Sequence, residues 1–418
     1  MIQEALQSIR VLDLSRILAG PWCTQMFADL GAEVIKIEHP ERGDDTRHLG
    51  PPWMTDSEGK SERDATYYAS TNRGKKSVGV DISTPEGAQI VRDLAATSDI
   101  FIENFKVGNL ARYKLDYESI KAVNPSIIYC SITGYGQTGP YSKRPGYDFA
   151  FQAEGGLMSI TGERDDLPGG GPQKSGVAIA DLTTGLYAST AILAALNYRN
   201  VTGLGQFIDM SLLDCVTALA SNQGTSHIMN GVNPTRLGNA HPALVPYQVF
   251  NASDGYVVVA VANDFQWQRL CTAIEREDLK YNGDFMTASG RIENREALIE
   301  QVQNAIRTKP VSHWLLVFDE NNVPHGKINS YKEVFEHPQI THRSMVVDVK
   351  NEDDDAIMKL IGCPIKLSQT PVKYKFTPPS LGRHTNEILS GMLHLDETQL
   401  EHLASRGVIR NASAKATD

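Results

Sequence analysis

One acidic residue stands out by its place in the sequence. Asp181 falls in the first turn of residues 179–198, a run rich in small and apolar residues that predicts one buried helix. The partial positive charge of a helix N-terminus stabilises an ionised carboxylate, and a carboxylate held there can serve as a nucleophile. The structural alternative is a helix cap, since aspartate is a favoured capping residue. Judged from this segment alone, the cap is the more common role.

Flexible glycines and basic residues accompany Asp181. The run Gly169-Gly170-Gly171 comes shortly before it, and predicts either a plain surface loop or a mobile cover that keeps water from a reactive intermediate. Basic residues on loops of one sheet face can together bind a phosphate-rich ligand, although each alone is usually a solvated charge. These residues are Arg47, Arg73, Lys75, Lys76 and Arg112.

The motifs and the net charge of the sequence argue against several other classes of function. The GxSxG, Walker A, HExxH and EF-hand motifs are absent, and neither the 11 histidines nor the 5 scattered cysteines have the spacing of metal ligands. We therefore expect no metal and no permanently bound cofactor. A net charge of −10 argues against a nucleic-acid partner, and no window approaches the roughly 18 consecutive apolar residues of a membrane span. The first residues lack the pattern of a secretory signal or transit peptide, which predicts a cytoplasmic protein, or one of the mitochondrial matrix if a presequence has been removed.

The elements that must position Asp181 begin with a βαβ unit. Residues 9–14 predict a strand, residues 22–30 a helix with Pro21 as its first residue, and residues 33–38 a second strand. The loop between strand and helix holds only Gly20, so the phosphate-binding pattern GxGxxG is absent and the unit indicates a fold without a nicotinamide or flavin site. Strands and helices keep alternating to about residue 131, which is typical of an α/β protein with a Rossmann-like, doubly wound, mostly parallel sheet.

The rest of the chain predicts a second domain. From about residue 241 the pattern changes to a β-hairpin, 247–250 and 256–262, followed by helices. We therefore predict a large α/β domain of residues 1–224, completed by residues 331–418, and a smaller α+β domain of residues 225–330. The polar stretch 40–66 predicts a long loop, of a kind that is usually functional or disordered. The other expected elements are strands at 78–81, 100–102, 127–131, 207–210 and 345–349, and helices at 85–97, 117–123, 212–221, 265–276, 291–307, 311–321, 386–392 and 397–406.

Several segments, in this order and spacing, resemble CoA-transferase family III, the group of formyl-CoA transferase and carnitine CoA-transferase. They are Ala19-Gly20-Pro21, the run from Asp29 to Glu38, Glu103-Asn104-Phe105, Gly134 to Pro140, and Asp181-Leu182-Thr183-Thr184-Gly185. The likeness extends from about Leu12 to Val408. It is strongest to the succinate–hydroxymethylglutarate (glutarate) CoA-transferase branch, through residues 127–135 and 245–248.

The resemblance implies a reaction in which Asp181 attacks an acyl-CoA thioester. An acyl-aspartyl anhydride and CoA thiolate form, and the thiolate then converts the anhydride into an aspartyl-CoA thioester and a free acid. An acceptor acid reverses these steps. A carboxylate nucleophile is needed because an anhydride conserves the energy of the thioester while the acids exchange. The substrates implied are an acyl-CoA, expected to be succinyl-CoA, and a small carboxylic or dicarboxylic acid.

The resemblance also implies which residues contact CoA and how the chain assembles. The implied contacts are Leu18, Ala19, Lys75, Lys76, Asn104, Phe105, Arg112 and Tyr135, and the loop cation Arg47 is expected to bind CoA with them. Two departures limit the carry-over: formyl-CoA transferase has glutamine where Leu18 stands, and its glycine loop in the later domain has no match after Asp264. Family members form homodimers of interlocked chains, and we expect the same here.

A relative with another reaction leaves an alternative open. The α-methylacyl-CoA racemases pair an aspartate like Asp181 with a histidine between glycine and aspartate, and here that triplet is Gly146-Tyr147-Asp148. Racemisation needs two bases flanking one carbon, and tyrosine has a high pKa for that work, so the sequence favours the transferase. For the distal carboxylate of a dicarboxylic substrate the candidate partners are Arg16, His39, Arg47 and His241.

Overall fold

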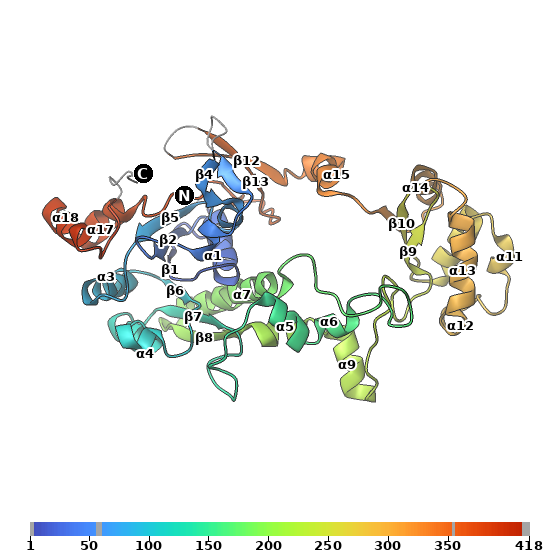
Figure 1. Ribbon diagram of the computed structural model, residues 1–418, viewed down its shortest axis with the longest axis horizontal. Coiled ribbons are helices and arrows are strands. Elements are labelled where there is room, and N and C mark those ends of the chain that lie inside the picture. Colours follow the sequence, from blue (N-terminus) through green and yellow to red (C-terminus); the bar gives the residue numbers. More distant parts are fainter. Residues whose placement is uncertain (1–3, 56–60, 353–355, 412–418) are drawn as a thin grey trace. The chain divides into compact units, whose positions relative to one another are not determined.

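The computed structural model describes residues 4–55, 61–352 and 356–411, without the side chains of residues 61–63. Contacts divide the chain into two compact units (Figure 1). The first comprises Met1–Leu157, Ser175–Ser221 and Gln339–Asp418, and the second comprises Met158–Lys174 and Asn222–Pro338. From the sequence we predicted domain boundaries at residues 225 and 330, and these boundaries stay a prediction.

A parallel sheet forms the centre of the first unit. Its six strands lie in the order β5-β2-β1-β6-β7-β8, and each neighbouring pair is parallel. The strand order reverses between β1 and β6, and ligands of open α/β sheets bind beyond the carboxyl ends of the strands at such a point. The strands are β1 (Arg10–Asp13), β2 (Glu33–Glu38), β5 (Lys75–Gly79), β6 (Ile100–Glu103), β7 (Ile128–Thr133) and β8 (Gln206–Ser211).

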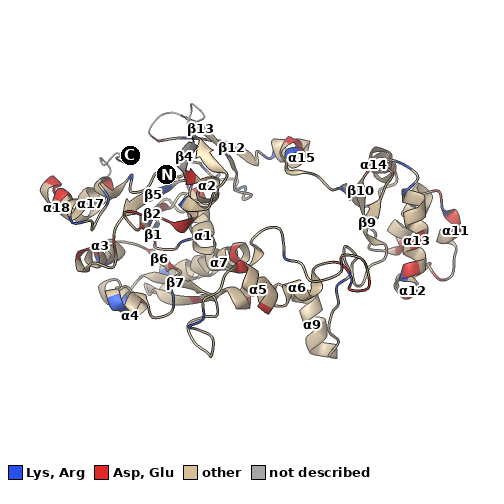
Figure 2. Ribbon diagram, viewed as in Figure 1, with Lys and Arg blue, Asp and Glu red and all other residues tan. Residues whose placement is uncertain are grey.

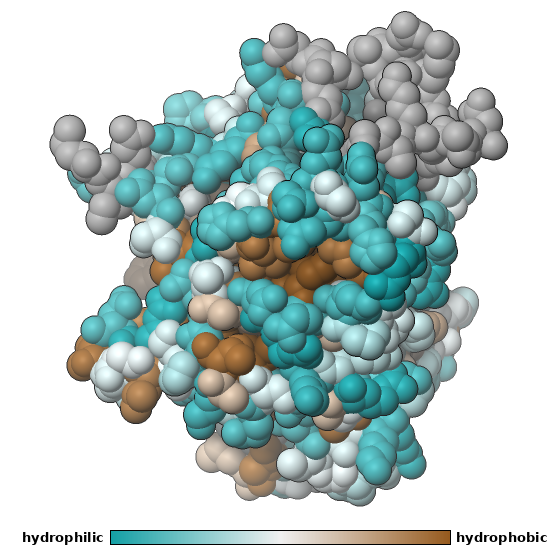
Figure 3. All heavy atoms as spheres, turned by 90° about the vertical axis from the view of Figure 1, so that its left-hand side faces the viewer, coloured by the Kyte–Doolittle hydropathy of each residue, from teal (hydrophilic) through white to brown (hydrophobic). Residues whose placement is uncertain are grey.

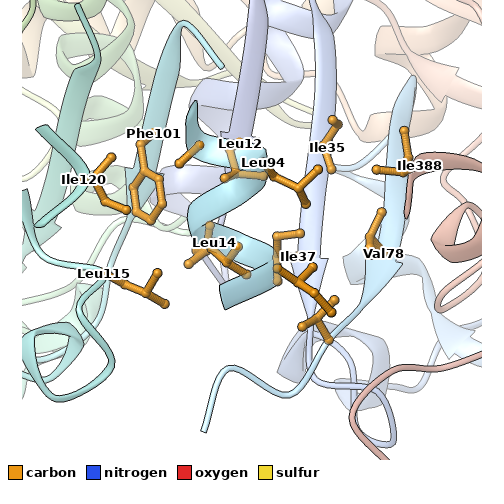
Figure 4. Packing of buried hydrophobic residues seen from close by; sticks show 14 of the residues in the cluster. Leu12, Leu14, Ile35, Ile37, Val78, Leu94, Phe101, Leu115, Ile120 and Ile388 are labelled. Atoms are coloured by element: carbon orange, nitrogen blue, oxygen red, sulfur yellow. The ribbon is translucent and has the colours of Figure 1, made fainter. Parts of the chain in front are cut away.

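Helices cover both faces of this sheet because its strands are apolar on both sides. Leu12 points into one buried cluster and its neighbour Val11 into the other, as alternation along a strand requires. The cluster of Leu12 receives Leu94 and Ile388 from two helices (Figure 4). Each such fully buried aliphatic side chain stabilises the fold by about 1.5–3 kcal/mol. The helices on the Leu12 side are α3 (Pro85–Ala96), α4 (Tyr117–Val123), α17 (Thr385–Leu393) and α18 (Glu397–Ser405), and those on the Val11 side are α1 (Ala19–Asp29), α7 (Ile179–Thr202) and α8 (Leu212–Ala218).

The helix that carries Asp181 packs unusually close to its neighbour. A Cβ on Gly185 of α7 would lie 2.6 Å from the carbonyl oxygen of Ala19, so only glycine permits this approach of α7 to α1. The helix ends at Gly203, whose φ of +77° is left-handed and whose N–H bonds to the Arg199 carbonyl at 2.7 Å. Within the described residues α7 is the one helix long and apolar enough to cross a membrane, and half of its apolar window is buried inside the protein, as in the core helix of a globular fold.

Shorter elements complete the first unit. Residues 40–66, expected as a loop, contain a short helix and a hairpin, and residues 56–60 of that stretch lie outside the described part. These elements are η1 (Asp45–His48), β3 (Trp53–Thr55), β4 (Ser61–Ala65), α2 (Thr66–Ala69), η2 (Leu110–Tyr113), α5 (Asp148–Glu154), β12 (Val346–Lys350) and β13 (Ile357–Ile361). Three helices extend across the boundaries between the units: α6 (Leu157–Ile160), α9 (Ser221–Asn230) and α16 (Pro338–His342).

The second unit contains a small antiparallel sheet of order β11-β10-β9, packed with helices around its own core. The predicted hairpin is confirmed as β9 (Tyr247–Asn251) and β10 (Tyr256–Ala260), and β11 (His325–Lys327) joins it as an unexpected third strand. The predicted single helix at 291–307 was wrong, because the chain breaks at Asn294 between two helices. The helices are α10 (Asp264–Ala273), α11 (Glu277–Lys280), α12 (Ala288–Glu293), α13 (Arg295–Ile306), α14 (Val311–Glu320) and α15 (Tyr331–Glu336).

Charged residues of both signs are spread along both units (Figure 2). The face of the molecule at the left of Figure 1 is mainly hydrophilic, with apolar side chains exposed in a hollow near its middle (Figure 3). The net charge of the chain is −10, so the average field over the surface repels a polyanion. A polyanionic ligand must therefore meet local groups of cations.

Candidate active site

Asp181 is the third residue of α7 and lines a cavity of about 510 Å³ in the first unit. Its side chain is half-buried. Within the described part of the chain, no hydrogen-bond donor reaches the Asp181 carboxylate, and the bond between Asp181 and Asp148 is made by the backbone N–H of Asp181. The carboxylate oxygens of Asp181 are therefore free of hydrogen bonds to the described residues.

Another residue caps α7. The helix begins after Ala178, which has no side-chain acceptor. Instead, the Oδ1 atom of Asp148 accepts hydrogen bonds from the N–H groups of Ala180 at 2.7 Å and Asp181 at 3.2 Å. Asp148 thus does the work of an N-cap from a distant segment, and the capping role that the sequence assigned as the common alternative for Asp181 is wrong.

The surroundings make Asp181 a weaker acid than usual. Burial raises the pKa of Asp181 to about 7, and the negative charge of Asp148 adds to the rise. At neutral pH a large fraction of the carboxylate is ionised, yet it is more basic than a solvated one. Perturbed acids of this kind are typical of catalytic sites.

The loops after β1 and β6 meet beside this cavity. The Oδ1 atom of Asn104 accepts from the Arg16 N–H at 2.9 Å, and its Nδ2 donates to the Arg16 carbonyl at 2.7 Å. The next residue, Ile17, has a φ of +70°, which is rare for a β-branched residue and costs on the order of 1–3 kcal/mol. Its N–H donates to Oδ1 of Asp44 at 3.2 Å. Bonds from two other loops therefore hold a strained turn at the cavity wall.

A second cavity adjoins the first. It measures about 310 Å³ and lies beyond the carboxyl ends of β1, β2 and β5, where Leu14, Glu38 and Val80 line it. Four residues line both cavities, namely Arg16, Asp45, Phe105 and Asn109. Together the two cavities form an elongated site that starts at Asp181.

Cations that the sequence analysis did not select line the Asp181 cavity. They are Lys106, Lys143 and Arg144, and in the described residues no carboxylate lies within ion-pair distance of any of them. Arg16 differs, since it pairs with Asp45 at 3.0 Å. Two signals in the sequence could have indicated these cations: Lys106 directly follows Asn104-Phe105, and Lys143-Arg144 shortly precede Tyr147-Asp148.

The structure brings several predicted CoA contacts to the site or beside it. Ala19, Asn104 and Phe105 line the Asp181 cavity, and Leu18 is the buried N-cap residue of α1 next to them. Arg112 donates to the hydroxyl of Tyr113 at 3.1 Å, and Tyr113 lines the second cavity. Tyr135 adjoins the lining residue Gly134, and its hydroxyl donates to Glu154 at 2.9 Å.

Arg47, Lys75 and Lys76 lie elsewhere. Arg47 is 1% exposed and binds both carboxylate oxygens of Glu38 at 2.8 Å, with its guanidinium over the Tyr68 ring. Lys75 is fully buried, where burial lowers its pKa to about 8 and Asp13 opposes that shift. Neither Arg47 nor Lys75 lines either cavity. A buried charge needs a partner of opposite sign, and the carboxylates beside these two cations already neutralise them. The strand starts at Lys75, three residues before the predicted 78, so Lys75 and Lys76 are strand residues and not loop residues. Lys76 pairs with Glu33 and Glu387.

The glycine run belongs to the second unit. Its backbone forms a turn in which Gly170 donates to the Leu167 carbonyl at 3.0 Å and Gly171 to the Glu163 carbonyl at 3.3 Å. The φ values of +83° at Gly169 and +139° at Gly171 explain why glycine is needed there. The role of this run as a cover stays a prediction. Of the proposed partners for a distal carboxylate, Arg16 lines both cavities and His39 the second, whereas His241 belongs to the second unit and packs on Tyr247.

In the described residues no three His, Cys, Asp or Glu side chains lie together in a group that could hold a metal ion. The five cysteines are buried free thiols.

Comparisons with known proteins agree on one family. Residues 6–385 match the model of CoA-transferase family III. The chain is 45% identical over 398 residues to the succinate–glutarate CoA-transferase of Agrobacterium fabrum, covering 94% of this chain and 97% of that protein. It is 41% identical over 406 residues to the human succinyl-CoA:glutarate CoA-transferase, covering 97% and 90%. The crystal structure of a CaiB/BaiF family protein from Brucella suis superposes with a TM-score of 0.83 at 43% identity, covering 94% of this chain and all of that one. The chain therefore belongs to CoA-transferase family III and is a CoA-transferase.

Proposed function

We propose that this enzyme transfers CoA from succinyl-CoA to a small dicarboxylic acid, with glutarate as the first candidate, through covalent intermediates on Asp181. The observation that carries the proposal is the state of Asp181, which is basic, half-buried and free of side-chain bonds at the wall of an elongated site. The names of the two relatives support the choice of substrates.

The two adjoining cavities suit the two ends of a CoA thioester. The second cavity lies where open α/β sheets bind nucleotides, and we assign the nucleotide of CoA to it. The pantetheine arm would then run past Asn104 and Phe105 toward Asp181, with Leu18 and Ala19 at the wall and Arg112 and Tyr135 nearby. We reassign Arg47 and Lys75 to a supporting role, because buried and paired cations have no free charge for a phosphate.

The proposed chemistry consists of four acyl substitutions. An Asp181 oxygen attacks the succinyl carbonyl carbon, the C–S bond breaks, and CoA leaves as the thiolate. That thiolate attacks the aspartyl carbonyl of the anhydride, which releases succinate and leaves an aspartyl-CoA thioester. An oxygen of the acceptor carboxylate then displaces the thiolate to give a second anhydride. Finally the thiolate attacks the acceptor's carbonyl, so the new acyl-CoA forms and Asp181 returns as a carboxylate.

Both the anhydride and the thioester would hydrolyse if water reached them, so the site needs a cover. We propose that Gly169, Gly170 and Gly171 supply it. We also propose a Rossmann-like fold for the first unit and an interlocked homodimer. Large apolar side chains exposed on α7 support the dimer; they include Leu186, Tyr187, Tyr198 and Val201. Unpaired cysteines support a reducing compartment, the cytoplasm or the mitochondrial matrix.

One experiment tests the central claim. Wild-type protein is mixed with succinyl-CoA and a panel of acids, and new acyl-CoA species are identified by mass spectrometry. We expect glutaryl-CoA from glutarate, and an intact-mass adduct of CoA on the protein when the acceptor is left out. Asp181→Asn is the matched variant, isosteric and unable to form either intermediate. Exchange that persists in this variant would remove Asp181 from the reaction.

The racemase alternative finds no support at the site. Tyr147 takes the place of the histidine, and it is 75% exposed, so the position lacks the imidazole that the racemases use as the second base. Deuterium exchange at the α-carbon of a branched acyl-CoA, measured in D₂O, is the discriminating assay. We expect none.

A further inference from the structure

A second carboxylate, that of Asp148, bonds the backbone at the turn that carries Asp181. We propose that Asp148 is a positioning residue of the transfer reaction: it holds the backbone of Asp181 at the start of α7 and places a like charge near the Asp181 carboxylate. The inference rests on the proposed role of Asp181 and deepens it. Nothing else in the described residues holds the start of α7 in this way.

The first part of the argument is geometric. Two consecutive N–H groups of α7, those of Ala180 and Asp181, converge on one oxygen of Asp148 at 2.7 and 3.2 Å. The second oxygen accepts from Nε2 of Gln152 at 2.6 Å. Gln152 is fully buried, and its own oxygen accepts from the Ser175 N–H at 2.8 Å. One oxygen of Asp148 is thus bonded to Gln152, and the other oxygen bonds the backbone of Ala180 and Asp181.

The second part concerns charge. Asp148 is the charged group that raises the pKa of Asp181 beyond the effect of burial. The charges of both aspartates also act on Tyr67 of α2, since burial first and then the charges of Asp181 and Asp148 raise the pKa of its hydroxyl. The other ionisable groups that line the Asp181 cavity are Arg16, Asp45, Lys106, Lys143, Arg144 and Tyr147. The thiols of Cys23 on α1 and Cys215 on α8 face α7.

The third part is the chemical consequence. A helix N-terminus alone would favour the ionised form of Asp181 and lower its basicity. Asp148 offsets that influence because it engages the two N–H groups itself and adds a like charge. The N-terminus therefore orders Asp181 without weakening it as a base, and a more basic oxygen is the better nucleophile toward a thioester carbonyl.

The test compares pH–rate profiles of full-length variants. Asp148→Asn keeps an oxygen for the two N–H groups and removes the charge. We expect the ascending limb of kcat/KM for CoA transfer to move to lower pH by about 1 unit, with KM for both substrates within about twofold of wild type. Asp148→Ala also removes the hydrogen bonds, and we expect kcat to fall at least tenfold more than in the Asn variant.

Asp396→Asn is the matched control, since Asp396 caps α18 with its side chain and its loss should leave the profile unchanged. Asp148→Ser, a neutral capping residue, serves as the second variant if the Asn variant misfolds. An ascending limb that stays in place in a folded Asp148 variant overturns the proposal. Failure of the wild type to exchange CoA with any acid would instead overturn the proposed function, so the two failures are distinguishable.

Discussion

Asn104 and Arg16 are joined by two hydrogen bonds, one in each direction, across the point where the strand order of the sheet reverses. The side-chain amide of Asn104, directly after β6, bonds both the N–H and the carbonyl of Arg16 in the loop after β1, as a neighbouring strand would. That loop carries Ile17 in its left-handed conformation. A single side chain thus ties together the two loops that line the site.

Asn104→Ala should release this strained turn. We expect KM for the acyl-CoA to rise about tenfold, equivalent to roughly 1.4 kcal/mol, because the wall that we propose as a CoA contact loses its order, while kcat changes less. Initial rates at saturating acceptor measure both constants. Asn321→Ala, which removes a comparable bond to a helix end in the second unit, is the control. A KM equal to that of wild type would show that the loop keeps its shape without Asn104.

Asp181→Asn should stabilise the protein as pH rises. Because the pKa of Asp181 is raised from 3.8 to about 7, the folded state binds a proton that the unfolded state gives up. The stability that this proton contributes is complete below about pH 4 and is lost as pH rises through 7. The Asn variant has no such loss, so its advantage over wild type should grow by on the order of 2 kcal/mol between about pH 5 and pH 8.

Melting temperatures across this pH range measure the advantage. Thr190→Ala, an exposed neutral change on the same helix, should give a difference from wild type that does not vary with pH. An Asp181→Asn difference that is equally flat would mean that the carboxylate has an ordinary pKa.

Arg144 and Lys143 should recognise the distal carboxylate of a dicarboxylic acceptor. Both line the cavity of Asp181 without an ionic partner in the described part of the chain. A charge-assisted hydrogen bond contributes about 1.5–3 kcal/mol, so Arg144→Ala should raise KM for glutarate by about ten- to a hundredfold. KM for butyrate, which has no distal carboxylate, should stay unchanged.

The same variant distinguishes a phosphate contact from a substrate contact. A rise in KM for succinyl-CoA with no change for glutarate would assign Arg144 to the phosphates of CoA. Lys332→Ala, an exposed lysine on α15 of the second unit, provides the control and should alter neither constant.

Arg47→Ala should destabilise the fold far more than it affects binding. The substitution leaves Glu38 buried, at 4% exposure, without its main partner, and breaking a buried ion pair costs about 3–5 kcal/mol. Lys76→Ala is the comparison, since its pairs with Glu33 and Glu387 are partly exposed and such pairs contribute about 1 kcal/mol or less. Urea unfolding measures both. Equal stabilities combined with a raised KM for acyl-CoA would return Arg47 to the role of a CoA ligand.

Much of the local structure followed from the sequence. The strand at 33–38 and the helix at 117–123 have the predicted limits, because apolar periodicity and local turn residues decide them. Pro21 was expected to open its helix, but α1 begins two residues earlier at Ala19. A proline without an N–H is tolerated anywhere in the first turn, where N–H groups have no partner within the helix.

By itself the sequence determined the α/β pattern, the helix that begins near Asp181, and the family to which the motifs point. Tertiary structure alone decided which aspartate is the cap and which is the free carboxylate, because the two N–H groups at the start of α7 are bonded by a residue 32 and 33 positions away. It also decided that Arg47 and Lys75 are buried, since the carboxylates that neutralise them come from other strands and loops. Periodicity reports on neighbours three or four residues apart, whereas charge pairing and capping across the fold depend on which segments the sheet brings together.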